Sequence, residues 1–125
     1  MDSEPHVIDA SAAVAFLMNE AGGERVGPLL PSGLMNAVNL TEVVTRLLRS
    51  GHDPIRAHYL GCSIVDHGVD LADRAGRLWP ITAALGLSLG DRACLALAQR
   101  EGLPVLTADR AWAALSLDVD VRLIR

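Results

Sequence analysis

Short apolar runs alternate with amphipathic stretches along this chain, a pattern typical of strands and helices that follow one another in a parallel α/β sheet. The apolar runs predict strands at residues 6–9, 33–38, 63–69, 103–107 and 119–124. The amphipathic stretches predict helices at 11–20, shortly after Gly23, from Asn39 to Gly51, from Asp53, from Asp70, from Ser88 to Gly102, and after Asp109. The chain has no internal repeat and no linker long enough to divide it, so residues 1–125 should form a single domain.

Two prolines mark expected helix boundaries. Pro54 follows Asp53 and suits the first turn of a helix, where no backbone donor is needed. Pro80 lies inside the helical stretch that begins at Asp70, and its missing N–H should break or kink that helix.

Four acidic residues stand near the points where a predicted strand passes into a helix: Asp9, Glu42, Asp91 and Asp109. In a parallel α/β sheet these points lie along one edge, so acids that are distant in sequence can meet in space. No lysine or histidine lies near them in sequence to balance their charge. A group of carboxylates of this kind is suited to a divalent metal ion, because hard cations prefer oxygen ligands.

The alternative interpretation is that each acid caps a helix. The segments 39–42 and 88–91 have the Asn/Ser-x-x-Glu/Asp spacing of a capping box. Asp9 and Asp109 could each accept an amide hydrogen bond where their own helices begin. Against this, two unit charges about 4 Å apart repel by roughly 4 kcal/mol at an effective dielectric near 20. Collecting all four acids at one edge for capping alone would be costly, which favours the metal site.

Composition narrows the possible chemistry. The 11 basic residues are all arginine, so any mechanism that needs a lysine is excluded. The formal charge of −4 disfavours a protein that coats nucleic acid by charge alone, although empty carboxylate ligands contribute to that charge. Cys62 and Cys94 form no CxxC pair, and the four histidines form no HExxH motif, so zinc is not expected. The apolar runs are too short to cross a bilayer, and the segment MDSEPH lacks the basic start of a secretion signal. We therefore expect a cytoplasmic protein.

Four segments carry a resemblance to a known family: VIDASAAVAFLMNE, VNLTEVVTRLL, LSLGDRACLALAQREGLPVLTADRAW and the closing VRLI. Together they resemble a PIN-domain ribonuclease, the VapC-type toxin of a type II toxin–antitoxin system. The resemblance covers nearly the whole chain and keeps the order and approximate spacing of the acids; it is weakest from Gly51 to Leu87. It implies an α/β fold of three layers (α/β/α) around a parallel five-stranded sheet. It also implies an endoribonuclease dependent on Mg²⁺ or Mn²⁺ that hydrolyses RNA phosphodiester bonds.

The resemblance also assigns roles to individual residues. Asp9, Glu42, Asp91 and Asp109 would be the catalytic residues and the metal ligands. Ser11 and Thr107 would support the site, with a turn-forming role as the alternative for both. The expected partners are an RNA substrate, a cognate antitoxin protein and a second copy of the chain in a homodimer, with no membrane.

The arginines near the acids have two interpretations each. Arg92 and Arg110 directly follow two of the acids and could bind substrate phosphates, or they could pair with acids on their own helices. Arg46 lies four residues after Glu42, which is the spacing of an ordinary helical ion pair.

Other families fit the sequence less well. A receiver domain and a haloacid-type phosphatase both need a lysine, and the phosphatase needs Asp-x-Asp where this chain has Asp9-Ala10-Ser11. The P-loop motif GxxxxGK[ST] is absent. Two alternatives stay open: a PIN-family nuclease that processes RNA without being a toxin, and a PIN-like scaffold without nuclease activity that binds RNA or protein.

Overall fold

The computed structural model describes residues 4–125, and the first three residues of the predicted domain lie outside the described part. Five strands form one parallel sheet in the order β3-β2-β1-β4-β5. They are β1 (Val7–Ile8), β2 (Leu34–Asn36), β3 (Ser63–Val65), β4 (Val105–Thr107) and β5 (Val121–Leu123). The predicted five-stranded parallel sheet is therefore confirmed, although each strand is shorter than its apolar run suggested.

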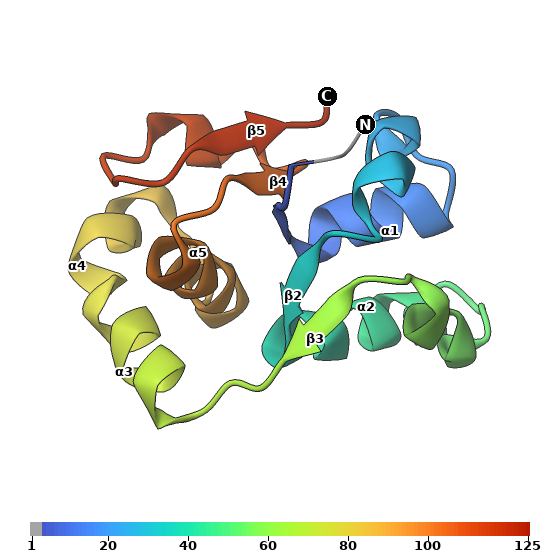
Figure 1. Ribbon diagram of the computed structural model, residues 1–125, viewed down its shortest axis with the longest axis horizontal. Helices are drawn as coiled ribbons and strands as arrows, with labels where there is room; N and C mark the ends of the chain where they lie inside the picture. The colour runs from blue at the N-terminus through green and yellow to red at the C-terminus, as the bar shows by residue number, and fades with distance from the viewer. Residues whose placement is uncertain (1–3) are drawn as a thin grey trace.

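Helices cover both faces of this sheet, so the predicted three-layer α/β/α architecture is also confirmed (Figure 1). Two helices, α1 (Ala10–Leu17) and α2 (Ala37–Arg49), lie on one face. The opposite face carries α3 (Val69–Arg77), α4 (Trp79–Thr82) and α5 (Leu89–Glu101). The remaining helical turns are 3₁₀ helices: η1 (Gly23–Arg25), η2 (Gly27–Leu29), η3 (Pro54–Tyr59), η4 (Ala83–Leu85) and η5 (Arg110–Ala114).

The central strands bury side chains on both faces, which explains their continuous apolar sequence. Successive residues of a strand point to opposite sides. Val7 and Val105 pack into the core beneath α3 and α5, while Ile8 and Leu106 pack into the core beneath α1 and α2. These four side chains are no more than 5% exposed. Two hydrophobic cores thus hold β1 and β4 side by side as a rigid base for the loops that follow them.

Helix α2 begins earlier than the sequence predicted. Its N-cap is Asn36, whose side-chain oxygen accepts a hydrogen bond from the backbone N–H of Val38 at 2.9 Å. The predicted start after Asn39, and with it the capping box of residues 39–42, is wrong. Asn39 instead lies inside the helix with a fully buried side chain. The strand predicted at 33–38 correspondingly ends at Asn36.

The break predicted at Pro80 is confirmed. Helix α3 ends at Arg77, and Pro80 falls in the first turn of the separate helix α4. The predicted helix after Asp53 is the 3₁₀ helix η3, and Asp53 caps it by accepting a hydrogen bond from the N–H of Ile55 at 3.0 Å. Within residues 4–125, no helix combines the length and apolar character that a bilayer crossing requires.

The order of the strands fixes where a site can form. From β1 the chain moves outward through β2 to β3, then returns to the other side of β1 for β4 and continues to β5. The direction of winding therefore reverses beside β1, and ligands in open parallel sheets bind at such a reversal, beyond the carboxyl ends of the strands. Asp9 directly follows β1, and Asp109 lies two residues after β4.

Candidate functional site

Asp9 occupies the centre of the acidic site and is held by two hydroxyl groups. Its Oδ2 atom accepts hydrogen bonds from Ser11 Oγ at 2.6 Å and from Thr107 Oγ1 at 2.9 Å. Its backbone N–H donates to Leu106 at 2.9 Å, which fixes it to the end of β4. Asp9 stands at the N-cap position of α1, but its carboxylate makes no cap hydrogen bond to that helix. The capping interpretation is therefore wrong for Asp9.

Ser11 and Thr107 also organise the chain after β4. Ser11 Oγ accepts a hydrogen bond from the N–H of Ala108 at 2.9 Å, and Thr107 Oγ1 accepts one from the N–H of Asp109 at 3.0 Å. Each hydroxyl thus donates to Asp9 and accepts from the backbone that leads to Asp109. The structure places both predicted supporting residues against the carboxylate they were expected to support.

Burial dominates the electrostatics of Asp9. The residue is 3% exposed, and this burial raises its pKa from 3.8 to about 6, against the opposing effect of the Ser11 and Thr107 hydrogen bonds. The charges of Asp91 and Glu42 raise the pKa further. A positive charge nearby would favour the ionised form and reverse this shift.

Glu42 extends from α2 toward α5 and lies over Gly90. Its Oε1 atom accepts a hydrogen bond from Asn39 Nδ2 at 2.8 Å, and the same amide group donates to the Gly90 carbonyl at 2.9 Å. A Cβ atom at Gly90 would lie 2.3 Å from Glu42 Oε2, so only glycine leaves room for the carboxylate there. Burial raises the pKa of Glu42, and the charge of Asp91 adds to the effect.

Sequence analysis did not identify Asn39 and Gly90 as part of the site. The side-chain amide of Asn39 donates hydrogen bonds to Glu42 and to Gly90, and so links α2 to α5. Its Oδ1 atom is buried without a hydrogen-bond partner in the described part of the chain. The three-residue spacing from Asn39 to Glu42 did signal an interaction between the two side chains. The signal was misassigned because a capping box has the same spacing.

Asp91 and Asp109 do cap helices, as the alternative interpretation predicted. Asp91 forms a capping box with Ser88: its Oδ2 accepts from the Ser88 N–H at 2.9 Å, and Ser88 Oγ accepts from the Asp91 N–H at 3.2 Å. Asp109 Oδ1 accepts from the N–H of Ala111 at 3.0 Å. Burial raises the pKa of Asp91 against the Ser88 hydrogen bonds, and the charge of Asp109 raises it further.

All four acids nevertheless share one property. In each, one carboxylate oxygen accepts the hydrogen bonds described above. The other oxygen accepts none from residues 4–125: Oδ1 of Asp9, Oε2 of Glu42, Oδ1 of Asp91 and Oδ2 of Asp109. One oxygen of each acid is thus anchored to the fold, and the other has no hydrogen-bond donor among residues 4–125.

This donor set fits a hard divalent cation in its chemistry, since it consists of carboxylate oxygens that repel one another. The pKa of Asp9 rises with the charges of Asp91 and Glu42, and that of Asp91 rises with the charge of Asp109. No three Asp, Glu, His or Cys side chains of residues 4–125 are gathered tightly enough to hold an ion as they stand. Binding a metal would therefore require the acidic side chains to close around it.

The arginines near the acids are held by other parts of the chain. Arg92 Nη1 donates to the carbonyl of Ala75 at 3.1 Å, and Arg110 Nη1 donates to the carbonyl of Arg125 at 3.1 Å. The expected ion pair between Glu42 and Arg46 is wrong, because Arg46 Nη2 instead meets Glu20 Oε2 at 3.1 Å.

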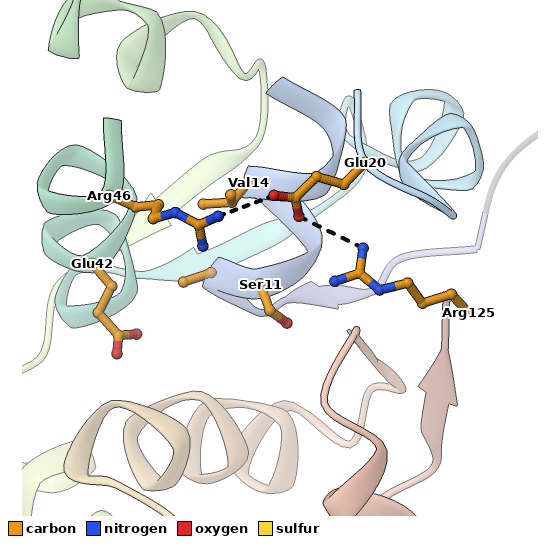
Figure 2. Close-up of a pocket in the computed structure, with 7 residues that line it drawn as sticks. Ser11, Val14, Glu20, Glu42, Arg46 and Arg125 are labelled. Carbon is orange, nitrogen blue, oxygen red and sulfur yellow. Dashed lines mark hydrogen bonds and ion pairs between the residues drawn. The ribbon is translucent and has the colours of Figure 1, made fainter. Parts of the chain in front are cut away.

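A pocket of about 180 Å³ opens beside the acidic site. Figure 2 shows Glu20 between the guanidinium groups of Arg46 and Arg125, with Ser11 and Glu42 nearby. Ala10 and Val14 of α1 complete its lining. Ser11 and Glu42 therefore belong to both the acidic site and this pocket.

Comparison with known proteins identifies the family. The model of the PIN domain family matches residues 6–116. The search of curated proteins found no match. Similar solved structures include a chain of a toxin–antitoxin complex from Klebsiella pneumoniae, with 17% identity, a TM-score of 0.75, and 96% of this chain and 98% of that chain covered.

Two further structures have the same fold. DNA-bound VapBC from Salmonella typhimurium gives 15% identity and a TM-score of 0.74, with 98% of this chain and 100% of that chain covered. VapC20 from Mycobacterium tuberculosis, a sarcin–ricin loop cleaving toxin, gives 16% identity and a TM-score of 0.73, with 91% of this chain and 98% of that chain covered. At these identities the structures establish the fold alone. Because the family model covers most of the sequence and the parallel sheet carries the ordered acids at its carboxyl edge, the chain belongs to the PIN domain family.

Proposed function

We propose that this protein is a metal-dependent endoribonuclease and the toxin of a VapBC-type toxin–antitoxin pair. The observation that carries the proposal is the arrangement of the four acids, each with one oxygen anchored and one free at the carboxyl edge of the sheet. Membership of the PIN domain family and the fold shared with VapBC structures support it. RNA as the substrate is supported by the likeness to VapC20, a sarcin–ricin loop cleaving toxin.

Bound Mg²⁺ or Mn²⁺ would polarise a phosphoryl oxygen of the substrate and lower the pKa of a coordinated water. Asp9, at the centre of the site, would be the principal ligand, oriented by Ser11 and Thr107. Asn39 fixes the direction of Glu42, and Gly90 leaves the space into which that carboxylate extends. These contacts would limit the rearrangement that remains when the acidic side chains close around the ion.

Asp91 and Asp109 would complete the ligand set through their free oxygens. Arg110 is exposed beside Asp109 and is the better placed of the two predicted substrate-binding arginines. Arg92 is partly buried, and its Nη1 is bonded to the Ala75 carbonyl of α3, so it is less accessible to RNA than Arg110.

The proposed partners follow from the VapBC complexes that share the fold. A cognate antitoxin would silence the nuclease in the cytoplasm, and two copies of the chain would form a homodimer. An antitoxin arginine placed among the four acids would supply the positive charge that the metal otherwise provides.

The test is cleavage of a mixed RNA pool by the purified protein, with Mg²⁺, with Mn²⁺ and with EDTA. The parent should cut only with metal, and Asp9→Asn should fold normally and lose at least about 100-fold in rate, because a metal ligand contributes several kcal/mol to the transition state. Asp53→Asn, which alters a helix cap outside the site, is the matched control and should cut like the parent. Cleavage by Asp9→Asn at the parent rate would refute the site assignment.

A toxin and an RNA-processing nuclease give different results in cells. Induced expression of the parent should arrest bacterial growth, and Asp9→Asn should not. Metal-dependent cutting in the tube without growth arrest would assign the protein to the processing nucleases.

A further inference from the structure

The pocket beside the acidic site contains two arginines that the proposed chemistry does not use. Arg46 comes from α2 and Arg125 lies beyond the end of β5, and both meet the carboxylate of Glu20, which follows α1 (Figure 2). Glu20 Oε2 lies 3.1 Å from Arg46 Nη2, and Glu20 Oε1 lies 3.6 Å from Arg125 Nη1. Two positive charges therefore share the carboxylate of Glu20, and Glu42 is the second acidic side chain of the lining.

These ion pairs are partly exposed to solvent. The side chains of Arg46, Arg125 and Glu20 are 48%, 38% and 29% exposed. Exposed pairs of this kind add little to folding stability. Stability therefore does not account for the grouping of three charged side chains in one pocket.

Both guanidinium groups keep donors available. A guanidinium carries five N–H donors in a planar fork that matches a phosphate. Among residues 4–125, the one acceptor of Arg46 is Glu20. Arg125 uses Nη1 for the carbonyl of Ala21 at 2.8 Å and for Glu20, so its Nη2 and Nε have no acceptor in that part of the chain.

The position of the pocket suggests its ligand. Ser11 and Glu42 line it and also belong to the acidic site, so the pocket and the acidic site are adjacent. The guanidinium donors left unused match the oxygens of a phosphodiester group. Contacts to phosphates fix the register of a nucleic acid without reading its sequence.

We propose that this pocket binds a backbone phosphate of the RNA neighbouring the one that is cut, with Arg46 and Arg125 as donors and Glu20 as the competing acceptor. The inference rests on the proposed nuclease function and adds the site that sets the register of the strand. Glu20 holds both arginines extended in the free protein and limits their affinity for a phosphate. Each arginine exchanges a carboxylate for a phosphate oxygen when RNA binds.

Binding measured without cleavage tests the inference. The probe is a short fluorescein-labelled RNA of mixed sequence, titrated in EDTA and followed by anisotropy over a range of salt concentrations. Arg46→Gln and Arg125→Gln should each weaken binding severalfold and reduce the slope of log K against log salt by about 0.7, the value for one phosphate contact on a single strand. Arg49→Gln removes an exposed arginine from the same helix and should stay within about twofold of the parent, because it loses only diffuse attraction.

Glu20→Gln makes the sharpest test, since it removes charge from the pocket without removing a donor. It should tighten RNA binding severalfold, whereas a purely structural ion pair would leave affinity unchanged. Thermal unfolding of all four variants confirms that each is folded at the temperature of the titration.

The outcomes separate the inference from the proposed function. Unchanged affinity in Glu20→Gln, or Arg46→Gln behaving like Arg49→Gln, overturns the phosphate pocket and leaves the nuclease standing if the parent cuts RNA with metal. A parent that neither binds nor cuts RNA overturns both.

Discussion

At the scale of single residues, the protonation of Asp9 connects burial with ligand binding. Its carboxylate is 3% exposed, and the two hydroxyl groups that bond to it do not compensate fully for the loss of water. Asp9 therefore ionises less readily without metal than a solvated carboxyl does. A bound cation would supply the missing solvation and lower its pKa.

This property predicts how stability depends on pH. The folded-state pKa of about 6 exceeds the unfolded value of 3.8, so the folded protein binds more protons between these pH values. The free energy of unfolding should then fall as pH rises from about 4 to about 6, by up to about 3 kcal/mol from Asp9 alone. Glu42 and Asp91 act in the same direction, because their pKa values are also raised.

Urea unfolding in EDTA at several pH values measures the effect. The difference in the free energy of unfolding between the parent and Asp9→Asn isolates the contribution of Asp9. The variant should become increasingly more stable than the parent as pH rises to about 6. A constant difference over that range would contradict the raised pKa of Asp9.

Gly90 gives a second prediction at this scale. Gly90→Ala should preserve or slightly raise stability, because alanine favours a helix by up to about 1 kcal/mol over glycine. It should also displace Glu42, since the new Cβ would lie 2.3 Å from Glu42 Oε2. We expect metal affinity and cleavage to fall at least about tenfold, measured by calorimetric titration and by RNA cutting. Gly76→Ala in α3 is the control, because its added Cβ would meet no atom within 4 Å apart from the backbone of its own helix. Equal metal affinity in Gly90→Ala and Gly76→Ala would show that Glu42 is not a metal ligand.

At the scale of elements, the helix that carries Asp91 depends on its first turn. Ser88 and Asp91 bond to each other's backbone and close the capping box of α5. Ser88→Ala should cost about 1 kcal/mol and lower the thermal midpoint by roughly 4 °C. Ser116→Ala, at an exposed position outside any helix, should leave the midpoint unchanged. An equal fall in the thermal midpoint of both variants would show that loss of the cap does not cause the destabilisation.

Local patterns predicted the elements more reliably than the contacts between them. Ser88 was correctly predicted as a cap because both partners of its box lie within one helical turn. The start of α2 was misplaced because Asn36 and Asn39 are both suitable caps by sequence. Which of the two asparagines caps the helix depends on α5. The Gly90 carbonyl of α5 accepts a hydrogen bond from the Asn39 side-chain amide, 51 residues away in sequence.

The same limit applies to the candidate site. Three-residue and four-residue spacings can be recognised in a sequence, but Arg46 pairs with Glu20 across 26 residues, and no periodic pattern records that contact. The acids themselves were identifiable because the parallel sheet has a rule for where its strand ends meet. Which of their oxygens are anchored depends on side-chain packing, and only the structure supplies it.

At the scale of the whole molecule, ionising Asp9, Glu42 and Asp91 together opposes folding, because the fold raises the pKa of each, and a cation should relieve them together. Mg²⁺ or Mn²⁺ should raise the thermal midpoint in proportion to the logarithm of its concentration, adding about 2.7 kcal/mol at 100 times the dissociation constant. Sodium chloride at equal ionic strength separates binding from simple screening. Asp9→Asn should lose most of the metal-specific increase. Identical midpoints in magnesium and sodium would argue against a metal site.

The pairing of β1 with β4 has a consequence for the protein's own synthesis. Asp9 is made before its partner Thr107, which follows 98 residues later. At about 5–20 residues per second, a ribosome needs roughly 5 to 20 s to cover that distance. During this interval Asp9 lacks the Thr107 hydrogen bond; Asp91 is added near the end of the interval and Asp109 just after it. A nascent chain of this design therefore completes the proposed metal site only after β4 has been made.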